Sequence, residues 1–172
     1  MISQFSGAVF DQHRAYRFIL WRFWNDAPRV LFVGLNPSTA NELQNDPTIR
    51  RCLGFAEKWG YGGMYFCNLY SYVSTDPRLL SSEEALHRAN IPAIMIATEL
   101  VVLTVAAWGD GVKLVKNGQS VAEHIKTLIE PSMCFGLTRR GNPKHPLYLS
   151  IDAQLVDYHL RLSEWRREKY SR

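Results

Sequence analysis

The chain has 172 residues, of which 47% are hydrophobic and 12% aromatic, and its formal net charge is +4. This length is typical of one domain with a substantial core, and the apolar content excludes an intrinsically disordered chain. The positive charge is compatible with a polyanionic partner, although a soluble enzyme that happens to be basic has the same balance. We therefore expect one domain over residues 1–172.

The sequence gives no sign of a metal site, a disulfide framework or a membrane segment. Its three cysteines, Cys52, Cys67 and Cys134, stand far apart and form neither a Cys-x-x-Cys pair nor a Cys/His cluster. The first residues lack the basic start and apolar core of a signal peptide, and Pro92 and Glu99 interrupt the longest apolar stretch. We therefore expect a cytoplasmic protein with reduced core cysteines.

The first part of the chain is predicted to form two strands and a helix. Residues 15–24 are aromatic and β-branched, and a short Asn-Asp-Ala-Pro turn joins them to an apolar strand at 29–35. Strands joined by so short a turn are expected to pair antiparallel. Asp46 is a typical N-cap and Pro47 suits the first helical position, so a helix is predicted from Pro47 to the glycines at 60–63.

The rest of the chain alternates strands and helices. The sequence predicts strands at 64–70, 100–108 and 132–138, and helices over 81–98, 117–129 and 151–169. Ser81 and Glu84 form a capping box for the first of these helices, which Pro92 is expected to kink or divide. Continuous apolar strands separated by helices indicate a parallel sheet covered on both faces. We predict a three-layer α/β/α fold with a mostly parallel four-stranded core sheet and an antiparallel N-terminal edge strand.

The residues that follow the core strands carry most of the functional information, because sheets of this kind bind ligands beyond the carboxyl ends of their strands. These residues are Gly34-Leu35-Asn36-Pro37-Ser38, then Asn68, then Trp108-Gly109, and, beyond a basic loop, His145. Each alone has a structural explanation as a turn, a loop-bonding Asn, a core Trp or a structural His. Together they predict a polar cleft whose carboxamides can pair with the edge of a heterocycle.

These four stretches resemble the motifs of the uracil-DNA glycosylase superfamily. The chain has GLNPS at 34–38, CNLY at 67–70, AWG at 107–109 and HPLYLS at 145–150, matching the GxNPG, strand-end Asn, Leu-Trp-Gly and HPSPLS elements of that superfamily. HPLYLS differs from HPSPLS at positions 147 and 148. The runs GLNPSTA, NDPTIRRCLGFAEKWGYGG and NLYSYVSTDP resemble, more narrowly, an uncharacterised family of bacterial and phage proteins.

The resemblance implies a hydrolase of the N-glycosidic bond that needs neither a metal nor an organic cofactor. His145 would donate a hydrogen bond to the leaving base, Asn68 would read the edge of the base, and Asn36 would position the water. The rest of the substrate pocket would consist of Gly34, Leu35, Pro37, Ser38, Trp108 and Gly109. The alternative role for Asn36 is to cap the following loop.

Two further features complete the expected site. An Asn cannot act as a general base, so Asn36 implies slow turnover or a better leaving group. Asp46 could supply a carboxylate, although helix capping explains it more simply. Phe66, Tyr70 and Tyr72 are candidates for the aromatic ring that stacks on the base, with core or loop packing as the alternative.

A basic loop and two apolar side chains are the predicted contacts to DNA. Arg139, Arg140 and Lys144 suit phosphate groups, through charge and neighbouring backbone N–H groups. Leu149 aligns with the leucine that members of the superfamily push into the duplex, and Tyr148 is a second candidate wedge. Packing at the lip of the cleft explains both side chains equally well.

We predict a monomeric DNA glycosylase-like hydrolase that releases an unusual, damaged or modified base, such as those of phage DNA, from duplex or single-stranded DNA. Two alternatives remain: a DNA- or nucleotide-binding protein without catalysis, and a hydrolase of free nucleosides or nucleotides. A role in repair and a role in antiviral defence are equally compatible with these residues.

Overall fold

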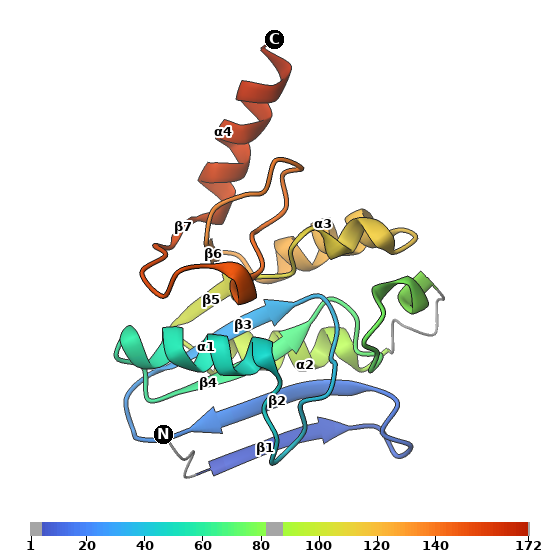
Figure 1. Ribbon diagram of the computed structural model, residues 1–172, viewed down its shortest axis with the longest axis vertical. Helices are drawn as coiled ribbons and strands as arrows, with labels where there is room; N and C mark the ends of the chain where they lie inside the picture. The colour runs from blue at the N-terminus through green and yellow to red at the C-terminus, as the bar shows by residue number, and fades with distance from the viewer. Residues whose placement is uncertain (1–4, 82–87, 172) are drawn as a thin grey trace.

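The computed structural model describes residues 5–81 and 88–171, which form a seven-stranded mixed sheet with helices on both faces (Figure 1). The strands are β1 (Phe5–Phe10), β2 (Arg17–Phe23), β3 (Arg29–Gly34), β4 (Gly63–Asn68), β5 (Leu103–Ala106), β6 (Met133–Cys134) and β7 (Val156–Asp157). Their order across the sheet is β1-β2-β4-β3-β5-β6-β7. The predicted α/β class is confirmed.

The centre of the sheet is the predicted four-stranded parallel core. β3 pairs in parallel with β4 on one side and with β5 on the other, and β5 pairs in parallel with β6. The register places Gly34 beside Asn68, so β3 and β4 end at the same level. The β3 residues Val30, Phe32 and Val33 are fully buried, because helices cover both faces of the central strands.

Four helices form the two outer layers around the sheet. They are α1 (Pro47–Lys58), α2 (Asn90–Glu99), α3 (Gly118–Leu128) and α4 (Tyr158–Tyr170). The core on one face of the sheet contains α1 residues such as Phe55. The core on the other face contains Ile94 of α2, Ile125 of α3 and Leu162 of α4. The far end of α4 extends away from the sheet (Figure 1).

The predicted antiparallel pairing of β2 with the strand that follows it is wrong. β2 pairs instead with β4 and with β1, an edge strand that the sequence analysis did not identify. The physical reason is that β4 and β5 occupy both sides of β3, which leaves β3 no free edge. The connection passes the start of β4, where the N–H of Gly62 donates to the carbonyl of Pro28 and the carbonyl of Gly62 accepts from the N–H of Trp24. β2 is therefore an interior strand.

The starts of the helices follow local capping chemistry. Asp46 caps α1 as predicted, with its Oδ1 accepting a hydrogen bond from the N–H of Ile49 at 2.8 Å. α2 begins only at Asn90, so Pro92 lies in its first turn, where a proline is tolerated, and neither kinks nor divides it. Glu84 of the predicted capping box lies outside the described residues.

The C-terminal part is less regular than predicted. The strand expected over 132–138 is reduced to β6, and the helix expected from residue 151 begins at Tyr158. The cause is β7, which pairs antiparallel with β6 immediately before α4 and holds the chain extended there. No helix in the described part of the chain has both the length and the apolar character needed to cross a membrane.

Candidate functional site

A cleft of about 550 Å³ opens beyond the carboxyl ends of the parallel strands. The chain leaves β3 for β4 through α1 on one face and leaves β4 for β5 through α2 on the other. The connections thus diverge at the end of β3, where α/β sheets bind ligands. The predicted site residues that line this cleft are Gly34, Leu35, Asn36, Ser38, Asn68, Trp108, Gly109, Lys144, His145, Tyr148 and Leu149. Four distant segments therefore meet at one site, as the strand ends predicted.

The turn after β3 holds Asn36 between two loops. Its Nδ2 donates to the carbonyl of Pro37 at 2.9 Å and to the carbonyl of Ser74 at 2.7 Å. Pro37, a predicted pocket residue, is buried and is not among the residues that line the cleft; its carbonyl connects the two loops by also accepting from the N–H of Ser74. Both amide protons of Asn36 are therefore used structurally, and its Oδ1 remains as an acceptor.

Asn68 is the most unusual polar residue of the cleft. Its side chain is 1% exposed, and neither Oδ1 nor Nδ2 has a hydrogen-bond partner in the described part of the chain. A Cβ atom on Gly34 would lie 3.0 Å from this Oδ1 and 2.8 Å from the ring of Phe66, so the glycine makes room for both side chains. A buried amide without partners is costly and is rare in native proteins. Its donor and acceptor are therefore available to a ligand.

Phe66 is the one of the three candidate stacking rings that lines the cleft. Tyr70 is 1% exposed within the core, and Tyr72 packs edge-on against Tyr16 with ring centroids 5.6 Å apart. The structure therefore assigns Tyr70 and Tyr72 to packing, which was the alternative interpretation. Phe66 and Asn68 point to the same face of β4, because they are two positions apart on one strand.

The end of β5 brings His145 close to the sheet. Gly109 has a φ of 70°, and a Cβ atom on it would lie 2.9 Å from the Cβ of His145. Its N–H donates to the carbonyl of Pro143 at 3.0 Å, which ties the β5 end to the loop before His145. Trp108 lines the cleft but is 1% exposed and packs edge-on against Tyr158. The glycine therefore positions His145, and the tryptophan serves mainly as a wall.

His145 is held as a neutral imidazole with a defined tautomer. Its Nδ1 accepts a hydrogen bond from the N–H of Leu147 at 3.3 Å and so caps the short helix η4 (Pro146–Tyr148). Burial lowers the pKa of His145, and the negative charge of Asp46 only partly opposes this effect. A neutral imidazole that accepts at Nδ1 carries its proton on Nε2. His145 can therefore donate from Nε2.

Two charged residues, Asp46 and Arg17, also line the cleft. Asp46, which caps α1 and was considered as a carboxylate in the sequence analysis, is 9% exposed. Arg17 on β2 is 1% exposed and also lines the cleft; one of its guanidinium nitrogens donates to the carbonyl of Ala40. Burial lowers the pKa of Arg17 to about 10, against the opposing effect of the Asp46 charge. Arg17 could have been identified as a candidate site residue from the sequence, because it is a charged residue within a largely apolar strand.

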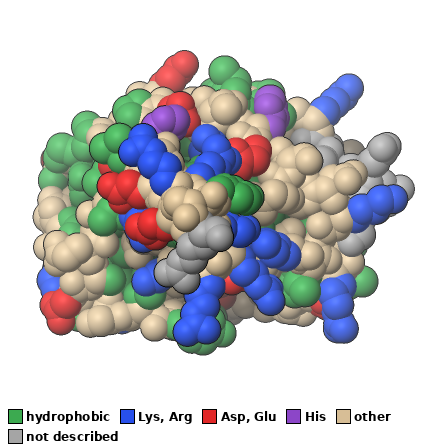
Figure 2. Space-filling view, turned by 90° about the horizontal axis from the view of Figure 1, so that it is seen from above, with side chains coloured by type: hydrophobic (Ala, Val, Ile, Leu, Met, Phe, Trp, Pro, Cys, Tyr) green, Lys and Arg blue, Asp and Glu red, His purple; other side chains and the backbone are tan. Residues whose placement is uncertain are grey.

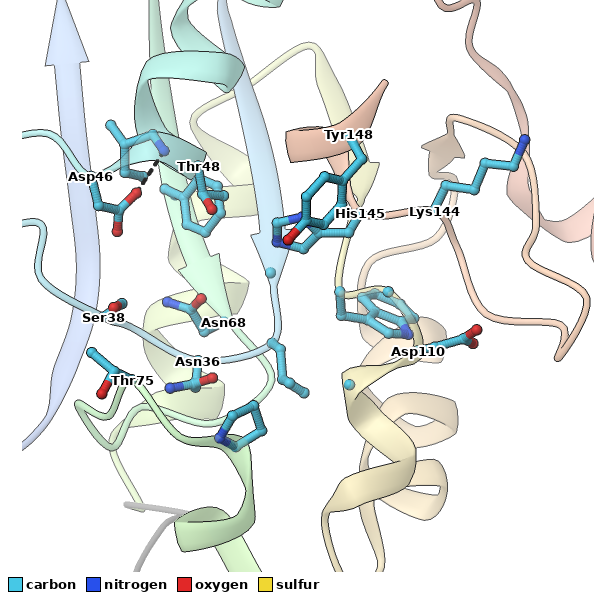
Figure 3. A pocket seen from close by; sticks show the side chains of 18 of the residues that line it. Asn36, Ser38, Asp46, Thr48, Asn68, Thr75, Asp110, Lys144, His145 and Tyr148 are labelled. Carbon is cyan, nitrogen blue, oxygen red and sulfur yellow. Dashed lines mark hydrogen bonds between the residues drawn. The ribbon is translucent and has the colours of Figure 1, made fainter. Parts of the chain in front are cut away.

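Figure 3 shows how the labelled side chains surround the cleft, with Asp46 and Thr48 on one side, Tyr148 and His145 on the other, and Asn68 and Asn36 between them. The lining residues that sequence analysis did not identify as site residues include Thr48, Ser74, Thr75, Pro77, Asp110, Gly111 and Thr138. They are short, mostly polar residues in loops and helix starts. Thr48, Ser74, Thr75 and Pro77 lie in the runs NDPTIRRCLGFAEKWGYGG and NLYSYVSTDP, which the sequence analysis used for a family resemblance and not for a site. Hydroxyl groups thus add to the hydrogen-bonding surface of the cleft.

The basic loop is anchored to the cleft but points its arginines elsewhere. Oδ1 of Asp110 accepts from Thr138 Oγ1 and from Asn142 Nδ2, both at 2.8 Å. Gly141 lies against the ring of Trp165 on α4, and the exposed Arg139 and Arg140 do not line the cleft. The two arginines are therefore placed outside the pocket itself, where they remain candidates for contact with a backbone beyond its rim.

The two candidate wedge residues differ in exposure. Tyr148 is 87% exposed at the rim, with its ring 6.3 Å from that of His145. Leu149 is half-buried and packs against the core under α1, and its carbonyl accepts a hydrogen bond from Arg51. The structure thus favours lip packing for Leu149. Tyr148 is the apolar side chain that projects from the rim.

No group of three or more His, Cys, Asp or Glu side chains within residues 5–81 and 88–171 is arranged to hold a metal ion. No curated protein and no solved structure matches the chain. A family model described as "Protein of unknown function (DUF1643)" matches residues 17–147, which is more than half of the chain. The matched segment contains Arg17, Asn36, Asp46, Asn68 and His145, and hence the chemical groups of the cleft. On this match, the chain belongs to the DUF1643 family.

Proposed function

We propose that the protein is a DNA glycosylase-like hydrolase that cleaves the N-glycosidic bond of an unusual, damaged or modified base. One observation carries the proposal: the carboxamide of Asn68, a residue that lines the cleft, is buried, and neither its donor nor its acceptor has a partner in the described part of the chain. A nucleobase edge offers a carbonyl oxygen beside a ring N–H, which would satisfy both groups of an amide at once. Binding of a base would therefore explain why the amide of Asn68 is left without a partner by the described residues.

The surroundings of Asn68 suit a flat heterocycle. Phe66 supplies an aromatic ring next to Asn68 on the same strand face, and stacking on such a ring is favourable for any base. The cleft volume of about 550 Å³ falls within the range of about 300–1,000 Å³ typical of small-molecule sites. A base that has left the DNA stack, with its sugar and a substituent, is a ligand of this size class.

His145 would stabilise the base as it leaves. As the bond breaks, negative charge grows on the base, and a hydrogen bond from Nε2 of the neutral imidazole strengthens with that charge. The donor is preorganised, because the N–H of Leu147 holds Nδ1. Loss of one such donor in other enzymes lowers the rate by about 100- to 1,000-fold.

Asn36 would orient the water that attacks the sugar. Its two amide protons are engaged by the carbonyls of Pro37 and Ser74, which leaves Oδ1 as the acceptor for a water proton. The same bonds lock the side chain, so the water would be held at a defined position. Precise placement of a reacting water lowers the entropic part of the barrier.

The DNA backbone would run past the rim near Lys144 and Tyr148. Lys144 points away from His145 on the side that leads to the basic loop (Figure 3). Figure 2 shows Lys and Arg side chains gathered around the end of the molecule that carries α4, with Asp and Glu among them. Arg139, Arg140 and Lys144 form no ion pair in the part of the chain that the structure describes. They are therefore free to hold phosphates.

The test is base release from a panel of DNA substrates. Duplex and single-stranded oligonucleotides carrying uracil, hypoxanthine or hydroxymethylated pyrimidines, together with phage DNAs that contain modified bases, are incubated and treated with alkali. Abasic sites then appear as strand breaks, and mass spectrometry identifies the released base. We expect release from at least one substrate, with a loss of about 100- to 1,000-fold in H145A. N36A is expected to be slow as well, whereas H159A, which removes an exposed histidine on α4, serves as the matched control.

The alternatives give different results in the same assay. DNA binding without release of any base supports a binding protein and contradicts the hydrolase. Cleavage of free nucleosides without detectable DNA binding at low salt supports a nucleoside hydrolase. Release at an unchanged rate in both H145A and N36A would show that the site assignment is wrong while the enzyme class is right.

A further inference from the structure

Asp46 has one carboxylate oxygen that the fold does not use. Its Oδ1 accepts from the N–H of Ile49, whereas its Oδ2 has no hydrogen-bond partner in the described part of the chain. The side chain is 9% exposed and lines the cleft. Figure 3 shows the second oxygen directed away from the capped N–H, on the side of the cleft that also carries Ser38.

Helix capping by itself does not require a carboxylate here. Asn and Ser cap helices about as well as Asp. Asp157 shows the ordinary case in this protein, since it caps α4 through the N–H of Leu160 at 2.8 Å and does not line the cleft. A carboxylate that is nine-tenths buried, with one oxygen unpartnered, pays a desolvation cost that a neutral cap would avoid. The negative charge of Asp46 therefore needs a further explanation.

Buried positive charge lies in the lining of the cleft, together with Asp46. Arg17 lines the cleft, and its guanidinium donates to the carbonyl of Ala40, whereas its Nε has no partner in the described residues. The charge of Asp46 interacts electrostatically with four groups: Arg17 and Arg22 on β2, Cys52 on α1, and His145 before η4. Two of these four, Arg17 and Arg22, are cations of opposite charge to a carboxylate.

We propose that Asp46 is the general base of the hydrolysis, a role that rests on the proposed function. Its Oδ2 takes a proton from the water, and the water oxygen bonds to C1′ of the sugar. The bond between C1′ and the base nitrogen breaks, and its electron pair leaves with the base, which accepts a hydrogen bond from Nε2 of His145. The proton on Asp46 is then lost to solvent or to the released base.

In this proposal Asp46 and Asn36 have different roles toward the attacking water. An amide takes up no proton near neutral pH, and both protons of the Asn36 amide are already engaged. Asn36 can therefore orient a water but cannot deprotonate it. Asp46 supplies the missing proton acceptor from a different segment, ten positions further along the chain.

The variant D46N tests the base and preserves the cap. Because Asn accepts the Ile49 N–H as well as Asp does, the midpoint of thermal unfolding and the affinity for substrate DNA are expected to stay near those of the wild type. The rate of base release is expected to fall by about 100- to 10,000-fold at neutral pH. D157N is the matched control, since it makes the same change at the cap of α4, and is expected to keep full activity.

The DNA affinity and the unfolding midpoint distinguish a base from a merely structural carboxylate, because loss of a structural carboxylate would lower them together with the rate. A loss of rate smaller than tenfold, or a loss accompanied by an equal fall in DNA affinity, would overturn the role of Asp46, while base release by the wild type still supports the proposed function. If the wild type releases no base from any DNA in the panel, both proposals fall.

Discussion

Asn68 provides a test that separates a binding residue from a structural one. Its buried amide has no partner in the described part of the chain, and an unpaired buried amide costs about 1–3 kcal/mol. Leu has the same number and branching of side-chain heavy atoms as Asn, and we take the packing cost of the swap as that of a well-tolerated core substitution, less than about 1.5 kcal/mol. We therefore expect N68L to raise the free energy of unfolding by about 1 kcal/mol, the difference between the penalty removed and the packing cost. The same change should abolish base release, because it deletes both groups that read the base.

A second buried asparagine supplies the comparison. Asn90 is also 1% exposed, but its Nδ2 donates to the carbonyls of Asn68 and Leu69, each at 3.0 Å. N90L leaves these carbonyls without their donor and should lower the free energy of unfolding by about 1–3 kcal/mol. The assay is urea unfolding of wild type, N68L and N90L. The midpoint urea concentrations are compared, provided that the unfolding free energy depends on urea concentration with the same slope in all three proteins. If N68L is destabilised as much as N90L, Asn68 has a structural role and the argument from its orphaned amide fails.

Two further predictions concern His145 and Gly109. Because burial lowers the pKa of His145 below that of the unfolded chain, the unfolded state binds more protons below about pH 6.5, and stability should fall as the pH drops through this value. H145N keeps an acceptor for the N–H of Leu147 and should lose this part of the pH dependence. If the unfolding free energy of wild type and H145N changes equally with pH, the predicted contribution of His145 is contradicted. G109A should lose stability, by about 1–2 kcal/mol for its positive φ and more for the clash with His145, and should also lose base release. G60A is the control, since Gly60 has a similar φ of 79° with nothing within 4 Å of the added Cβ; base release that survives in G109A as well as in G60A would refute the positioning role.

The central parallel strands and the start of α1 could be predicted from local patterns in the sequence. The continuous apolar runs became the parallel strands β3, β4 and β5, because strands buried on both faces need apolar residues at every position. Asp46 and Pro47 marked the start of α1 correctly, since a cap and an N1 proline act within a single turn. The ends of these strands then located Asn36, Asn68 and His145 around one cleft.

The peripheral strands did not follow from local patterns. β2 pairs with β4 instead of β3, the next strand in the chain, because β4 and β5 pair with both sides of β3. The residues around β2 and β3 in the sequence do not indicate these pairings. β6 and β7 are two-residue strands held by each other and by β5, so their pairing comes from tertiary contacts and not from strand propensity.

The sequence by itself determined which residue types stand at the ends of the core strands, because strand and turn chemistry acts over a few neighbouring residues. Only the tertiary structure decided the state of each side chain. Among the described residues the Asn68 amide has no partner, both amide protons of Asn36 are engaged, and Nδ1 of His145 accepts a hydrogen bond, which leaves the proton on Nε2. The tertiary structure also brought Arg17 and Asp46 into the lining of the same cleft. The reason is physical: hydrogen-bond saturation, burial and charge depend on atoms from segments far apart in the chain, which meet only when it folds.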